Sequence, residues 1–140
     1  MKMKGLIIAA VVIAVVVILF MRSYNKMKNT PAVADSDLIE HLTAQNFAHK
    51  TKKGVVLVDF WADWCMPCKM MAPVLNDVAE ATEGTATIYK LNVDEQQQVA
   101  AQYGIRSIPT MILFKDGKEV ERIIGVKSKE AVIASINKAK

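Results

Sequence analysis

The chain has 140 residues, which leaves room for one compact domain and little else. Its net charge of +4 comes from 18 basic and 14 acidic side chains, but five of the basic residues precede Asp35, the first acidic one. The remaining 13 basic and 14 acidic side chains nearly balance, so the charge does not favour nucleic-acid binding and no nucleic-acid partner is expected.

An unbroken apolar run from Leu6 to Met21 dominates the N-terminal part of the chain. These sixteen residues would extend about 24 Å as a helix, which is enough for an upright helix in a thin bilayer. We therefore expect residues 1–22 to form a transmembrane anchor that enters the membrane through residues 6–21.

Two other interpretations of the apolar run are open. A cleaved signal sequence is the first, because Ala32-Val33-Ala34 offers a small-residue cleavage pattern. That pattern lies a dozen residues beyond the apolar run, with three basic residues in between, which is unusual for a signal sequence. A buried core element is the second interpretation, although no polar side chain breaks the apolar surface of the run.

The membrane orientation is only weakly encoded. Positive charges favour the cytoplasmic side, but Lys2 and Lys4 on one flank balance Arg22, Lys26 and Lys28 on the other. A short basic stretch followed by an apolar run is also how export signals begin. We expect a single-pass protein of the inner cell membrane with its domain on the extracytoplasmic side.

The composition changes after the apolar run. Residues 23–35 are polar and contain Asn29, Thr30 and Pro31, which discourage regular structure, so this segment is interpreted as a tether. Residues 36–140 are interpreted as the globular domain. The elements expected there are, in chain order, a short edge strand and a short helix within 37–53, a strand at 55–61, a helix at 65–80, a strand at 86–93, a helix at 95–103, strands at 110–114 and 119–124, and a helix at 128–140.

Local signals support several of these elements. The continuous apolarity of 55–61 is typical of a strand covered on both faces. Asp116-Gly117 between two strand-like runs predicts a hairpin, and Ser128 is a suitable cap for the last helix. From residue 55 onward the order is βαβαββα, which predicts an α/β fold with a central mixed β-sheet and helices on both faces.

The two cysteines, Cys65 and Cys68, are the candidate reactive groups. A zinc site needs about four ligands, and neither a second cysteine pair nor a suitably spaced histidine is present. A purely structural disulfide would close a very small loop and stabilise little. A C-x-x-C pair that follows a buried strand and opens a helix instead favours redox chemistry.

The start of a helix has chemical consequences for the first cysteine. Free amide N–H groups and the positive end of the helix dipole stabilise an anionic sulfur, so we expect a lowered pKa for Cys65, which would be the attacking thiolate. Cys68, one turn further on, would resolve the mixed disulfide. Pro67 removes a backbone donor and stiffens the turn between the two sulfurs.

Two segments carry a resemblance to a known family. Phe60 to Lys69, with the sequence FWADWCMPCK, and Ile105 to Thr110, with the sequence IRSIPT, resemble the two hallmark segments of the thioredoxin family. The resemblance covers about residues 36–140 and implies the thioredoxin fold, with a cis bond before Pro109. Met66 departs from the family pattern, in which this position is usually glycine.

The resemblance also implies roles for individual residues. Cys65 would be the nucleophile and Cys68 the resolving thiol, while a buried Asp59 relays a proton and Lys90 sets its electrostatics. The ordinary structural alternatives are an exposed strand-end carboxylate for Asp59, a surface lysine for Lys90 and a strand start for Pro109. The residues expected to bind substrate are Trp64, Met66, Pro67, Ile108, Pro109 and Gly125.

The expected function is a thiol–disulfide oxidoreductase that reduces protein disulfides. Its redox-active group would be the Cys65–Cys68 disulfide, with no cofactor and no metal. Its partners would be protein disulfide substrates and an electron source, either a thioredoxin reductase or a membrane electron carrier. The alternatives are an exported dithiol oxidant, a disulfide isomerase, or a non-catalytic module that docks a partner.

Overall fold

A computed structural model describes residues 2–28 and 33–140. The chain separates into two units, one before and one after the boundary between Pro31 and Ala32. The first unit contains helix α1 (Lys2–Lys28). Its stretch Ile7–Asn25 has a mean hydropathy of 2.6 and is long and apolar enough to cross a membrane. Residues 29–31 of the expected tether, and Ala32 of the expected cleavage pattern, lie outside the described residues.

The second unit is built on a five-stranded sheet with the order β1-β3-β2-β4-β5. β1, β3 and β2 are parallel, whereas β4 is antiparallel to β2 and β5 is antiparallel to β4. The predicted mixed sheet is therefore confirmed. The strands are β1 (Ile39–His41), β2 (Val55–Trp61), β3 (Thr87–Asn92), β4 (Thr110–Lys115) and β5 (Lys118–Ile124).

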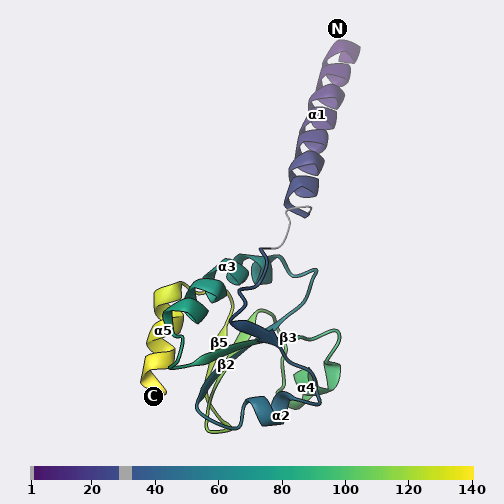
Figure 1. Ribbon diagram of the computed structural model, residues 1–140. Coiled ribbons are helices and arrows are strands. Elements are labelled where there is room, and N and C mark those ends of the chain that lie inside the picture. The colour runs from purple at the N-terminus through teal and green to yellow at the C-terminus, as the bar shows by residue number, and fades with distance from the viewer. Residues whose placement is uncertain (1, 29–32) are drawn as a thin grey trace. The chain divides into compact units, whose positions relative to one another are not determined.

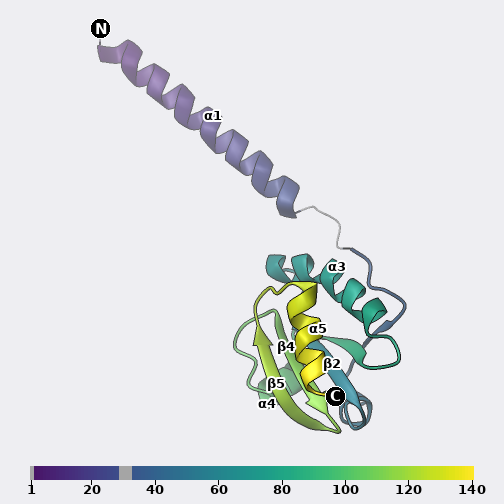
Figure 2. The same ribbon diagram turned by 90° about the vertical axis from the view of Figure 1, so that its left-hand side faces the viewer.

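Helices cover both faces of this sheet, as Figures 1 and 2 show. The helices of the domain are α2 (Phe47–Lys50), α3 (Met66–Ala81), α4 (Gln97–Gln102) and α5 (Lys129–Lys138). α3 and α5 pack on one face, and α2 and α4 pack on the other. This arrangement confirms the expected fold class.

The central strand β2 is buried on both faces, which explains its continuous apolar sequence. Side chains alternate along a strand, so Val55 and Leu57 join the core beneath α3 and α5. Val56, Val58 and Phe60 join the second core beneath α2 and α4. Both faces are buried, which is why the run has no polar alternation.

The structure departs from expectation at two places near the N-terminus of the domain. α1 continues to Lys28, six residues into the segment that was expected to be irregular. The first helix of the domain spans only Phe47–Lys50, within the expected region and shorter than it.

Candidate active site

The two cysteines lie where β2 gives way to α3. Cys65 is the N-cap residue of α3, and its Sγ accepts a hydrogen bond from the backbone N–H of Cys68 at 3.2 Å. Pro67 occupies the first turn of the helix, where a missing N–H leaves no helical bond unmade. The two sulfurs are joined in a disulfide, with the Cα atoms 5.3 Å apart. The sequence placed this pair correctly at a helix start.

Asp59 lies buried in β2, with 1% of its surface exposed. By strand alternation it points to the face that α3 and α5 cover, beside the apolar side chains of Val55 and Leu57. Its burial excludes the alternative of an exposed strand-end carboxylate. Desolvation raises the pKa of Asp59 to about 7, the Lys90 ammonium opposes this rise, and the Asp35 carboxylate adds to it.

Lys90 is Asp59's neighbour on β3 and is likewise buried. It is therefore not an ordinary surface lysine. Its Nζ donates a hydrogen bond to Asp35 Oδ1 at 2.7 Å and lies 4.4 Å from the ring centroid of Trp61. Among the residues that the structure describes, Asp59 Oδ1 and the indole nitrogen of Trp61 are buried without a hydrogen-bond partner.

The loop before β4 closes the other side of the site. The Ile108–Pro109 peptide bond is cis, and Ile108 packs against the apolar cluster of Ala62, Cys65 and Cys68. The carbonyl of Pro109 accepts a hydrogen bond from the N–H of Gly125 at 2.9 Å. The loop before β4 is thus in contact with the cysteine pair through Ile108 and is bonded to the end of β5 through Pro109.

An apolar groove runs beside the disulfide. Trp64 and Ile108 line it together with Val93, Ala100 and Ile105, and Arg106 and Ser107 are its polar lining residues. Trp64 is 67% exposed, and its indole N–H donates to Asp94 Oδ2 at 2.8 Å. The groove therefore presents an anchored aromatic ring to the solvent next to the cysteine pair.

The other residues expected to bind substrate do not line this groove themselves. Met66 and Pro67 are exposed at the start of α3, directly after Cys65. Pro109 and Gly125 are held together by their backbone hydrogen bond, next to Ile108 in the chain. Met66, Pro67 and Pro109 are thus joined to the groove or to the cysteines through a neighbour in the sequence, and Gly125 is joined through its hydrogen bond to Pro109.

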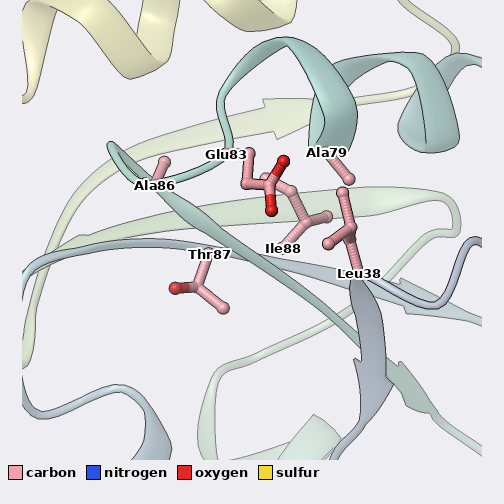
Figure 3. A pocket seen from close by; sticks show the side chains of 7 residues that line it. Leu38, Ala79, Glu83, Ala86, Thr87 and Ile88 are labelled. Carbon is pink, nitrogen blue, oxygen red and sulfur yellow. The ribbon is translucent and has the colours of Figure 1, made fainter.

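A second hollow lies away from the cysteines. Figure 3 shows it between the end of α3 and the beginning of β3, where Glu83 is the only charged lining side chain. It is at the amino ends of the parallel strands, whereas the cysteines follow the carboxyl end of β2. Among residues 2–28 and 33–140, no group of three or more His, Cys, Asp or Glu side chains gathers as a metal site would require.

Comparisons with known proteins agree with this geometry. The family model described as Thioredoxin matches residues 38–138. Thioredoxin from Chlamydia caviae is 48% identical over 100 residues, covering 71% of this chain and 97% of that protein. Thioredoxin from Staphylococcus aureus is 49% identical over the same share of this chain and 96% of its own length.

The chain belongs to the thioredoxin family. Its fold also matches a solved structure, a mutant thioredoxin from Halobacterium salinarum, with a TM-score of 0.68 and 36% identity over 76% of this chain and 95% of that one. The Cys65–Cys68 pair is the C-x-x-C of the family, and the protein is a thiol–disulfide oxidoreductase. The matched family segment begins at residue 38, so α1 and residues 29–37 lie outside the match.

Sequence reasoning missed two polar contributors to the site. Asp94 anchors the indole of Trp64, and Asp35 holds Lys90. Asp94 lies just beyond the end of β3, so its place near a strand end was a usable signal. Asp35 offered none, because it lies in a segment whose composition indicated an irregular tether.

Proposed function

We propose that this protein is a membrane-anchored thioredoxin that reduces protein disulfides through Cys65 and Cys68. The observation that carries the proposal is the N-cap position of Cys65, whose Sγ already receives a backbone N–H at the start of α3. In the reduced protein the same donor and the helix dipole stabilise a Cys65 thiolate. The relatives named thioredoxin support the reducing direction.

The reaction takes place in two exchanges. The Cys65 thiolate attacks one sulfur of the substrate disulfide, forms a mixed disulfide and displaces the other substrate sulfur as a thiolate, which takes up a proton. Cys68 then gives up its proton and attacks Cys65 Sγ, which releases the second substrate thiol. The substrate gains two electrons and two protons, and the protein is left with the Cys65–Cys68 disulfide.

Asp59 is the proposed acceptor of the Cys68 proton. Cys68 is buried, so its thiol has little access to bulk water. The carboxyl group of Asp59 lies on the α3-facing side of β2 and has a pKa of about 7, so near neutrality it is able both to accept and to release a proton. Lys90 is proposed to adjust this proton affinity through its charge.

The groove is the proposed binding site for an extended segment of the substrate. Its exposed Trp64 and the apolar Ile108 offer contact area beside the disulfide. Met66, Pro67, Pro109 and Gly125 are proposed to border the same surface. Met66 adds a flexible side chain next to Cys65, which is expected to reshape the contact with substrate.

α1 is the proposed membrane anchor, and the domain is proposed to face the extracytoplasmic side. The apolar composition and length of the Ile7–Asn25 stretch support the anchor. On that side, a membrane electron carrier with its own dithiol would supply the two electrons and two protons that regenerate the Cys65–Cys68 dithiol. A domain on the cytoplasmic side would instead be served by a soluble reductase.

Mixed-disulfide trapping tests the assignment of the two cysteines. The full-length Cys68→Ser variant should accumulate a mixed disulfide between Cys65 and a test protein with an accessible disulfide, because no resolving thiol remains. The Cys65→Ser variant should trap far less and should have lost turnover. Equal trapping by both variants would reject these roles, and full function without either cysteine would favour a non-catalytic docking module.

The reduction potential of the Cys65–Cys68 couple tests the direction. A value of about −270 mV, typical of thioredoxins, supports a reductant. A value of about −120 mV, typical of a strong dithiol oxidant, would contradict it and favour the oxidising alternative. Met66→Gly is a useful comparison, because it restores the usual residue of the family and so isolates the contribution of the Met66 side chain to the reduction potential.

A further inference from the structure

The three residues 34–36, which precede β1, lie against α3. Asn76 of α3 donates its side-chain N–H to the carbonyl of Ala34 at 2.9 Å. Its Oδ1 accepts the backbone N–H of Ser36, also at 2.9 Å. One amide side chain therefore fixes the backbone on both sides of Asp35.

The carboxylate of Asp35 points from this Asn76 clamp on residues 34–36 towards β1 and β3. Its Oδ1 accepts from Lys90 Nζ and its Oδ2 contacts His41 Nε2, each at 2.7 Å. The Lys90 side chain is 6% exposed, so this ion pair is largely shielded from water. Partial burial raises the pKa of Asp35, but the hydrogen bonds from Lys90 and His41 outweigh it and hold that pKa below its ordinary value.

Lys90 is therefore shared between two carboxyl groups. Across the β2–β3 register it is the partner of Asp59, yet its hydrogen bond goes to Asp35. Because Asp35 is ionised, it cancels part of the positive potential that Lys90 would otherwise direct at Asp59. Asp59 keeps its proton more tightly as a result.

Only some of the elements around Asp59 contribute charged groups, and α5 faces it with the apolar Val132 and Ile136. β3 contributes Lys90, β1 contributes His41 through its contact with Asp35, and β4 contributes only the neutral Met111 opposite Asp59. α3, which covers this face, contributes the cysteine pair at its first turn. Asp35 is thus the one additional anion in this group among the residues that the structure describes.

We propose that Asp35 is a positioning residue for the dithiol chemistry, which competes with Asp59 for Lys90 and so sets the pH at which Asp59 exchanges its proton. Asn76 holds Asp35 in place for this role. The proposal rests on the proton transfer by Asp59 proposed above. Asp35 precedes the matched segment 38–138, so a residue outside the family match contributes a side chain to the site.

The direct test is a pH titration of the Asp59 carboxyl group, monitored by NMR. It uses the full-length oxidised protein in detergent micelles. Asp35→Asn keeps the size of the side chain and one oxygen that can accept from Lys90, and it removes the charge. We expect the Asp59 midpoint to fall by about half a unit to one unit in this variant, because Lys90 then acts on Asp59 alone. Asp35→Glu, which keeps the negative charge, should have an Asp59 midpoint close to that of the parent protein.

Asp37→Asn is the matched control, since it removes the same charge from an exposed side chain two residues away. It should leave the Asp59 midpoint in place. Asn76→Ala should lower the midpoint in the same direction as Asp35→Asn by a smaller amount, because the backbone around Asp35 loses two hydrogen bonds. An unchanged midpoint in Asp35→Asn, or an equal shift in Asp37→Asn, would overturn the proposal.

Kinetics separate this inference from the proposed function. The rise of the reduction rate with pH should move to lower pH in Asp35→Asn and should not move when Asp59 is already Asn. If Asp59→Asn itself left the rate and its pH profile unchanged, the proton relay would be rejected, while the NMR titration would still decide whether Asp35 controls Asp59.

Discussion

Asp59 is the one charged side chain in β2, and every other residue of that strand except Trp61 packs into one of two apolar cores. Its burial favours the protonated form and raises its pKa to about 7, well above the ordinary value of 3.8. Between about pH 4 and about pH 7 the native protein retains a proton that the unfolded chain has released. The free energy of unfolding therefore falls as pH rises through this window and then levels off.

The Asp59→Asn variant should lose this pH dependence. With no carboxylate left to bury, the oxidised full-length variant should be more stable than the parent at about pH 8, by about 1–3 kcal/mol. The buried amide keeps part of the desolvation cost, which is why the gain is smaller than the whole linkage term. Denaturant unfolding at several pH values measures it.

The disulfide-reducing activity of Asp59→Asn should fall, although its stability rises. The same variant should reduce disulfides more slowly near neutral pH, since Cys68 loses its proton acceptor, and should remain folded. Asp77→Asn, an exposed change on α3, serves as the control and should alter neither property. A retained fall in stability between about pH 4 and about pH 7 in Asp59→Asn would show that another group titrates there.

At the scale of the elements, the β4–β5 hairpin shows how local chemistry fixes a connection. Asp116 and Gly117 both have positive φ, at 49° and 83°, as the type I′ turn of a two-residue hairpin requires. Asp116 Oδ1 also accepts the N–H of Gly54 at 2.9 Å, and its N–H donates to the Gly54 carbonyl. The turn is therefore bonded to the start of β2 as well as closing its own hairpin.

Asp116→Ala should destabilise the domain by about 1–2 kcal/mol. The alanine loses the bond to Gly54 and has to adopt a left-handed backbone that its Cβ disfavours. Chemical denaturation should give a lower midpoint with an unchanged slope. Lys118→Ala, an exposed change next to the turn, should have little effect, and an equal loss in both variants would contradict this account.

The hairpin also shows which features the sequence could predict. Asp-Gly flanked by strand residues, the doubly buried run of β2, the cap at Ser128 and the C-x-x-C at a helix start are local patterns with local causes, and the structure has all of them. The clamp of Asn76 on residues 34–36 depends on two single hydrogen bonds between segments about forty residues apart. No periodicity or composition encodes such contacts.

The same limit applied to the pairing of Lys90. Its position beside Asp59 followed from the family resemblance, and the register of β2 and β3 places it there. Its hydrogen bond to Asp35 depends on how the chain enters the domain before β1. The polar composition of residues 23–35 did not predict that the end of this segment would be hydrogen-bonded to α3.

At the scale of the whole molecule, the chain joins a 27-residue helix to a thioredoxin domain. The helix has basic residues at both ends, Lys2 and Lys4 before the apolar run and Arg22, Lys26 and Lys28 after it. For the proposed membrane anchor, the positive-inside bias is therefore nearly balanced, and small changes in charge should have visible effects on orientation. The side of the membrane determines which disulfides and which electron source the dithiol meets.

Antibody access to terminal tags measures that orientation. We expect a tag placed after the exposed Lys140 to be detected on intact spheroplasts, and a tag before Met1 to be detected only after permeabilisation. Changing Lys26 and Lys28 to Gln should strengthen this orientation, because Lys2 and Lys4 then form the dominant cytoplasmic charge. Changing Lys2 and Lys4 to Gln instead should make part of the population adopt the opposite orientation. Detection of the C-terminal tag only after permeabilisation would place the dithiol in the cytoplasm, and loss of the N-terminal tag from the mature protein would indicate cleavage of the segment in place of an anchor.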